Sequence, residues 1–180
     1  MLKKIILIIF FVFLSKYSYS NEKQKIIQKL EETKNLKFDF IQTLDKSVET
    51  GNCILEFSNK FLCHYNEVKK KILIENNILY LVDEFNNKSS QNITGTPFLL
   101  LVNKNEMINI LKDIEDFKIS NNRISIRINF LLNESIDLFF DNETYLISGW
   151  KVNNYDGSSL EFNLKNLLSN LKNIDNFFLN

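Results

Sequence analysis

The spacing of hydrophobic residues changes shortly before residue 38. Upstream, Ile26, Ile27 and Leu30 lie on one side of a helical wheel, so residues 22–35 are predicted to form an amphipathic helix. Downstream, hydrophobic and polar residues alternate from Phe38 and Phe40 onward, as in strands with one buried face. The alternation recurs in the ranges 52–57, 60–65, 72–74, 124–130, 136–140 and 160–165, and the range 78–82 is hydrophobic throughout. These patterns predict roughly eight to ten strands that form a meander of hairpins.

Short polar segments between these ranges predict the turns. The turn signals are Ser58-Asn59-Lys60, Asn76-Asn77, Asp141-Asn142 and Asp156-Gly157. Gly149 lies beside Trp150 within a hydrophobic segment, where a glycine indicates a β-bulge or the close approach of another backbone.

Two further helices are predicted in the middle of the chain, between the two sets of strands. Thr96 suits an N-cap, and Pro97 suits the first position of a short, very hydrophobic helix, because that position needs no backbone N–H donor. Asn103, with Glu106 three residues later, predicts the start of the next helix, whose hydrophobic residues lie within 107–111.

A meander with one hydrophobic face must curl to cover that face, which predicts a sandwich or a barrel. If the barrel is incomplete, the three helices can cover its mouth. Two interpretations then remain open: a packed core, or an apolar cavity under a helical lid that holds a hydrophobic ligand. The residues expected to line the cavity and lid are Ile26, Ile27, Leu30, Phe38, Phe40, Leu55, Phe57, Phe61, Pro97, Phe98, Leu101, Ile126, Ile128, Leu138, Phe140 and Phe162.

Residues 1–20 have the pattern of a cleavable signal peptide. Lys3 and Lys4 precede the hydrophobic stretch 5–14, and Ser18 and Ser20 occupy the small-residue positions of a cleavage site. We expect residues 21–180 to form a single soluble domain in the periplasm; an uncleaved N-terminal anchor is the alternative. Of the 22 basic residues, 19 follow this leader, and with 22 acidic residues the exported chain would carry a net charge of −3.

Composition argues against several kinds of active site. The chain has one histidine, His64, and no carboxylate motif flanks it to orient an imidazole base. Cys53, Cys63 and His64 lack the spacing of a zinc site. We therefore expect no enzymatic activity, no metal and no cofactor, and the balanced charge gives no reason to expect a nucleic-acid partner. Cys53 and Cys63 have the same strand parity on adjacent arms of a hairpin, so a disulfide and two free thiols both remain open.

Several short motifs follow one another in a characteristic order. They are Phe40-Ile41-Gln42, Gly51 at the start of a strand, Tyr65 at the end of the next, the run 79–83 after an Asn-Asn turn, Thr96-Pro97 before a hydrophobic helix, and Gly149-Trp150-Lys151-Val152 within 146–156. In this order and spacing the chain, over about residues 26–178, resembles the outer-membrane lipoprotein carrier protein family, LolA.

The resemblance implies an incomplete antiparallel β-barrel whose mouth is covered by short helices. It also implies a monomeric, non-enzymatic periplasmic chaperone that shelters the acyl chains of lipoproteins. The implied partners are acylated lipoproteins, an inner-membrane lipoprotein-releasing ABC transporter, and an acceptor at the outer membrane that is either LolB-like or the membrane itself. One departure is that Phe57-Ser58 stands where the family typically has Arg-Pro, so an inward Phe57 would latch the lid by apolar contact.

Two other functions remain open at this point. A chain with the same architecture could carry or sense a different lipid, because a fold does not determine its cargo. Alternatively, a β-domain with a filled interior could act only through protein contacts.

Overall fold

The computed structural model describes residues 21–45, 47–58, 60–115, 117–130 and 134–177. The signal peptide predicted over residues 1–20 lies outside these ranges, as does Asn59 of the first predicted turn. Whether residues 21–180 form a single domain after cleavage therefore stays a prediction.

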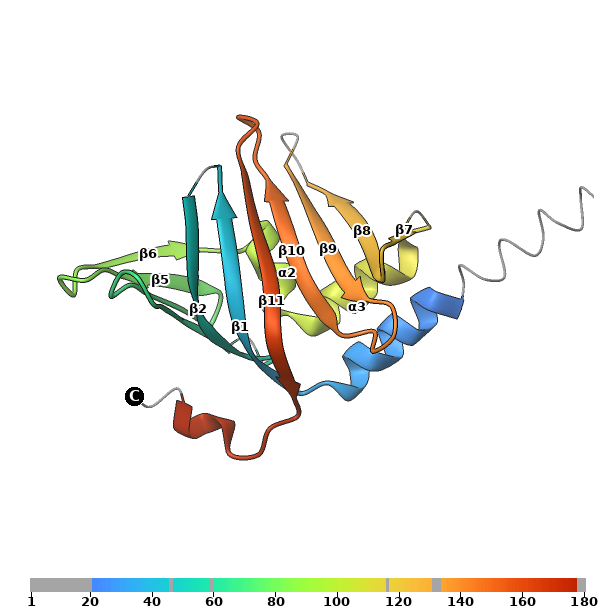
Figure 1. The fold of residues 1–180 in the computed structure, drawn as a ribbon, viewed down its shortest axis with the longest axis horizontal. Helices are drawn as coiled ribbons and strands as arrows, with labels where there is room; N and C mark the ends of the chain where they lie inside the picture. The colour runs from blue at the N-terminus through green and yellow to red at the C-terminus, as the bar shows by residue number, and fades with distance from the viewer. Residues whose placement is uncertain (1–20, 46, 59, 116, 131–133, 178–180) are drawn as a thin grey trace, which may run out of the picture.

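The described residues form one antiparallel sheet of eleven strands (Figure 1). The strands are β1 (Asn35–Leu44), β2 (Ser47–Glu56), β3 (Lys60–Tyr65), β4 (Lys71–Glu75), β5 (Ile78–Val82), β6 (Lys88–Asn92), β7 (Phe117–Ser120), β8 (Arg123–Asn129), β9 (Ser135–Asp141), β10 (Ile147–Asn153) and β11 (Ser159–Ser169). Their order is β6-β5-β4-β3-β2-β1-β11-β10-β9-β8-β7, so β6 and β7 are the two edges of a curled sheet that does not close. The predicted incomplete barrel is confirmed, with one strand more than the predicted upper number.

Two hairpins are stabilised in different ways: β4–β5 by its turn residues and β2–β3 by a disulfide. Asn76 and Asn77 both have positive φ angles, of 53° and 62°, as a two-residue turn between twisted strands requires. In the β2–β3 hairpin Cys53 lies directly opposite Cys63, and the structure joins the two in a disulfide. This bond fixes the register of a hairpin at the centre of the sheet.

Two glycines lie where side chains would not fit. The β9–β10 register shifts between Ile147 and Gly149, and a Cβ atom at Gly149 would collide with the carbonyl oxygen of Phe162, so both features expected at this glycine are present. Gly51 was predicted to start a strand, and this prediction is wrong. It lies within β2, because Ser47–Thr50 already pair with β1. A Cβ atom at Gly51 would collide with the Phe40 ring and the His64 carbonyl.

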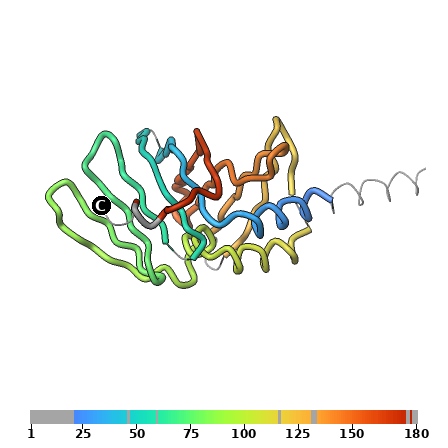
Figure 2. Tube along the Cα trace, turned by 90° about the horizontal axis from the view of Figure 1, so that it is seen from below, coloured from blue at the N-terminus to red at the C-terminus, as the bar shows by residue number. Residues whose placement is uncertain are grey.

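Three helices pack against the inner face of the sheet. The N-terminal helix covers residues 21–32 in the described part, α2 covers Pro97–Val102 and α3 covers Lys104–Asp113 (Figure 2). The N-terminal helix thus ends earlier than predicted, because Asn35 already begins β1. Thr96 is the N-cap of α2 but makes no side-chain capping bond, whereas the Asn103 side chain caps α3 by accepting from the Glu106 N–H.

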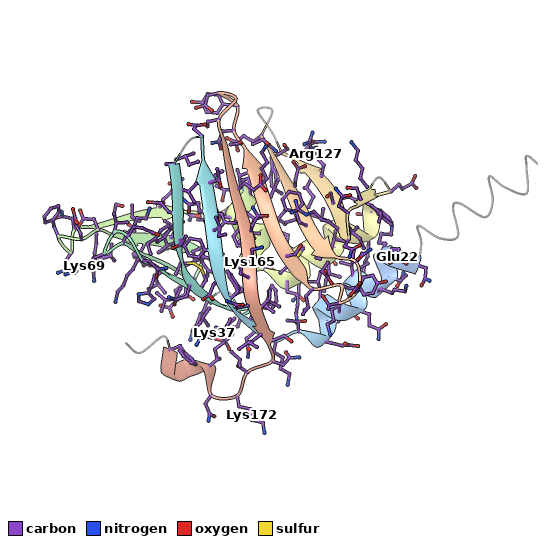
Figure 3. All side chains as sticks on the ribbon, in the orientation of Figure 1. Glu22, Lys37, Lys69, Arg127, Lys165 and Lys172 are labelled. Atoms are coloured by element: carbon purple, nitrogen blue, oxygen red, sulfur yellow. A yellow bond between two sulfur atoms is a disulfide. The ribbon has the colours of Figure 1, made fainter. Side chains whose placement is uncertain are left out.

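One hydrophobic core joins these helices to the sheet. Ile26, Leu100 and Met107 of the helices belong to the same buried cluster as Phe38 and Phe140 of the strands. Charged side chains such as Lys165 and Arg127 lie on the sheet away from this cluster (Figure 3). At the end of the described chain, the short η2 helix (Ile174–Phe177) returns toward β1, and the Lys37 ammonium lies 4.7 Å from the centre of the Phe177 ring.

Candidate functional site

A cavity of about 70 Å³ lies between the sheet and α2. Strands β1, β3, β4, β5, β10 and β11 form its wall, and α2 covers it. The lining residues are Gln42, Phe61, Cys63, Tyr65, Ile72, Ile74, Leu79, Phe98, Leu101, Val102, Trp150, Leu160 and Phe162. Almost all of the surface that these residues present to the cavity is apolar.

The residues expected to line a cavity divide into two groups, apart from Phe57, which is partly buried against the core. Phe61, Phe98, Leu101 and Phe162 line the cavity described above. The structure places Ile26, Ile27, Leu30, Phe38, Phe40, Leu55, Pro97, Ile126, Ile128, Leu138 and Phe140 in buried positions outside the cavity lining. The β2–β3 disulfide lies at the cavity wall through Cys63.

Sequence reasoning did not select several residues of the wall. Ile72, Ile74 and Leu79 have the strand parity of their neighbours, and this signal could have identified them. Gln42 and Tyr65 are polar residues within the motifs quoted above, and only their burial reveals their place in the wall. Trp150 lies directly after the bulge glycine, and the bulge decides where its ring points.

The polar groups of Gln42 and Tyr65 bond to each other and to groups outside the cavity. The Tyr65 hydroxyl donates to Gln42 Oε1 at 2.6 Å, and Gln42 Nε2 donates to Glu49 Oε2 at 2.8 Å. Lys70 Nζ lies 2.9 Å from Glu49 and 3.8 Å from the centre of the Tyr65 ring. Burial, and to a lesser extent the Glu49 charge, raises the pKa of Tyr65, so the hydroxyl stays a neutral donor. The network therefore keeps these polar atoms satisfied without a ligand.

Trp150 is held firmly in the wall. Its ring stacks on Phe162 at a centroid distance of 4.8 Å and meets Phe38 edge to face at 6.3 Å. Trp150 as a whole is 3% exposed. Among the described residues its Nε1–H has no hydrogen-bond acceptor.

Two lysines tie the N-terminal helix to α3 at both ends. Lys23 Nζ donates to the backbone carbonyls of Lys112 and Ile114, at 2.9 and 3.0 Å, where α3 ends. Lys104 Nζ, at the start of α3, donates to the Thr33 carbonyl at 2.9 Å, where the N-terminal helix ends. Each ammonium thus lies at the negative end of the partner helix, where it is electrostatically favoured.

The α2 helix has no comparable polar attachment. All six of its residues are apolar, and its N-cap makes no side-chain hydrogen bond to it. It follows Gly95, whose positive φ of 79° requires a residue with little steric restriction. Within the described cover, α2 is therefore the element held mainly by apolar packing.

Phe57, the residue at which the resemblance to the lipoprotein carriers departs, lies next to the start of α3. It is partly buried against the hydrophobic core, and Lys104 Nζ lies 5.7 Å from the centre of its ring. The contact with the lid therefore includes a cation–π interaction as well as apolar packing.

Apart from Tyr65, the titratable groups of the described sheet lie outside the cavity lining. Burial, followed by the nearby Lys71 charge, lowers the pKa of His64, which is on the opposite side of β3 from Cys63. Burial raises the pKa of Asp137, but hydrogen bonds from Arg127 and Asn153 outweigh it, so that pKa lies below its ordinary value. Among the described residues there is no cluster of three or more His, Cys, Asp or Glu that could hold a metal ion.

No helix in the described ranges is both long and apolar enough to span a membrane.

No protein-family model matches the chain, and no curated protein matches it. Similar solved structures include MucB of Pseudomonas aeruginosa in its complex with MucA, with a TM-score of 0.50, 8% identity and coverage of 89% of this chain and 60% of that chain. The chain shares this fold, a curled antiparallel sheet that does not close and has helices against its inner face. It spans about three fifths of the length of the MucB chains it matches, 58% and 60% in two structures.

The match with two other solved structures spans nearly the whole length of the neighbour's chain. The lipoprotein LppX of Mycobacterium tuberculosis gives a TM-score of 0.46 at 7% identity, with coverage of 86% of this chain and 97% of that chain. A LolA superfamily protein of Nitrosomonas europaea gives 0.43 at 7% identity, with coverage of 86% and 96%.

Proposed function

We propose that this chain is a non-enzymatic periplasmic carrier that shelters the acyl chains of lipoproteins on their way from the inner to the outer membrane. The observation that carries the proposal is the apolar cavity beneath α2 in a LolA-like fold. Such a carrier receives its cargo from an inner-membrane ABC transporter and delivers it to an outer-membrane acceptor. The signal sequence predicted at residues 1–20 supports the periplasmic location.

An acyl chain needs such a shelter. At ~0.8 kcal/mol per CH₂ group, a chain of ~16 carbons costs on the order of 12 kcal/mol to leave in water. A carrier meets this requirement by replacing the water around the chain with apolar side chains, and no bond has to be made or broken.

The resting cavity is too small for the whole chain. A volume of about 70 Å³ holds roughly five to seven groups of water or methylene size at 10–15 Å³ for each. The cover must therefore move for cargo to enter. We assign this movement to α2. Hydrogen bonds from Lys23 and Lys104 hold the N-terminal helix and α3 together, whereas apolar packing is what mainly holds α2. Closure in the absence of cargo keeps the apolar lining out of water.

A second candidate is a sensor that acts through protein contacts and binds a lipid as its signal. MucB, which has the same fold, was solved in complex with MucA, and a shared fold is compatible with either role.

Native mass spectrometry of the protein purified from the periplasm tests these proposals. Bound lipoprotein is the expected result, and bound free lipid would favour the carrier or sensor of another lipid. If neither is bound and the protein takes up no apolar dye, the cavity proposal is wrong. Depleting the protein should leave outer-membrane lipoproteins at the inner membrane, and N-terminal sequencing should find Asn21 as the first residue.

A further inference from the structure

The Trp150 indole is a hydrogen-bond donor without an acceptor at an otherwise apolar cavity. Trp150 lines the cavity, is 3% exposed, and has an Nε1–H that finds no partner among the described residues. Leaving a buried N–H unpaired costs free energy, and buried donors in folded proteins are nearly always paired. An acceptor bonded to this N–H would remove that cost.

Groups already present at the cavity do not supply that acceptor. The edge-to-face contact with Phe38 offers at most a weak interaction with the ring. The two polar side chains of the lining bond elsewhere: Gln42 Oε1 accepts from the Tyr65 hydroxyl and Gln42 Nε2 donates to Glu49. Neither side chain accepts a hydrogen bond from the indole. A buried water is stable only with about two to four polar partners, and the almost wholly apolar surface of the cavity offers few of them.

The contacts around the indole restrict the directions in which it can turn. Its ring is stacked on Phe162, which is its cross-strand neighbour on β11, and Leu138 is its neighbour on β9. The adjacent bulge at Gly149, where the Phe162 carbonyl approaches closely, fixes the backbone. The orientation of the donor is therefore restricted before any ligand binds.

We propose that Trp150 Nε1–H donates a hydrogen bond to the carbonyl oxygen of an acyl ligand. This inference rests on the proposed function and adds to it a ligand class: the cavity recognises an acyl group, with its ester or amide carbonyl, and not only a hydrocarbon chain. The carbonyl end of the chain lies at Trp150. The rest of the chain extends under α2 toward Ile74 and Leu79, which line the cavity from β4 and β5 at the far end of the strand order.

The substitution Trp150→Phe removes the donor and keeps an aromatic ring. Binding of methyl laurate and of an alkane of equal length is measured by displacement of an apolar dye from wild type and from Trp150→Phe. Trp150→Phe should lower the affinity for methyl laurate relative to the affinity for the alkane by roughly two- to twelvefold, the effect of one neutral hydrogen bond. If both ligands lose affinity equally, or neither does, the inference is wrong while the cavity still binds apolar chains. If wild type binds neither ligand, the proposed function itself fails.

A second measurement on the wild-type chain does not depend on the variant folding. Trp150 is the only tryptophan in the chain, so ¹⁵N-labelled protein has a single indole N–H signal. Methyl laurate should move this proton signal downfield, as hydrogen bonding does, and the alkane should not. In fluorescence, bromine placed near the carbonyl of the ester should quench Trp150 more than bromine at the methyl end. Equal indole shifts with ester and alkane, or stronger quenching from the methyl end, would overturn the inference.

Discussion

The assignment of α2 as the moving part of the lid can be tested with a matched pair of leucines. Leu101 lies on α2 and lines the cavity, and Leu111 lies on α3, is fully buried and does not line it. Both Leu→Ala variants should lower the free energy of unfolding by about 2–5 kcal/mol, which urea denaturation measures. The two substitutions thus perturb stability similarly but act on different helices.

The uptake of an apolar dye should distinguish the two variants. Removing three carbons from Leu101 weakens the closed lid by at most roughly 2.4 kcal/mol at ~0.8 kcal/mol for each carbon. Stopped-flow uptake should then accelerate by up to roughly fiftyfold, since ~1.4 kcal/mol corresponds to a factor of ten. Leu111→Ala should leave the rate close to that of wild type, because α3 stays attached to the N-terminal helix. Equal acceleration in both variants would refute the assignment, as would no acceleration in Leu101→Ala.

The remaining predictions concern the lid contacts, the disulfide and pH. Phe57→Arg places a second cation beside Lys104 and should change the rates of dye uptake and release; unchanged rates would contradict a role in the latch. Lys23→Met should lower the free energy of unfolding by about 1 kcal/mol in urea denaturation and leave dye uptake unchanged. Reducing the disulfide, whose cysteines are 10 residues apart in sequence, should cost roughly 2–3 kcal/mol in thermal unfolding compared with the oxidised protein. The lowered pKa of Asp137 stabilises the fold above about pH 4, and this contribution is lost as pH falls further; Arg127→Gln should therefore show a shallower loss of stability in acid titration.

Most of the sheet could be predicted from the sequence because its strands have one buried face. Two strands escaped this signal for different reasons. All five residues of β6, Lys88–Asn92, are polar and exposed, so the strand has no hydrophobic alternation and is defined only by its hydrogen bonds to β5. The strand β7 has only four residues and lies at the other edge, although Asn121 and Asn122 carry the same turn signal as Asn76-Asn77.

The cavity was less predictable than the sheet. Alternation identifies the face on which a side chain lies, and it placed Phe40 and Phe162 together on the inner face. It does not determine how far along a curled strand the covering helices reach. Phe38 and Phe140 belong to the packed core and do not line the cavity, whereas Phe61 and Phe162 line the space beneath α2. That distinction depends on the relative placement of distant elements, which local spacing does not encode.

A carrier of this kind needs a wall that stays in place while its cover moves, and the chain distributes its interactions in that way. The wall is braced by the disulfide at Cys63, by the stacked rings of Trp150 and Phe162, and by the Tyr65 and Gln42 network. Each of these contacts joins strands of the sheet, and none of them involves α2. The cover over the cavity contributes mainly apolar packing, and an incoming acyl chain can replace that packing with similar contacts. Exchange of cover for cargo then costs little free energy, so loading and release can both proceed at useful rates.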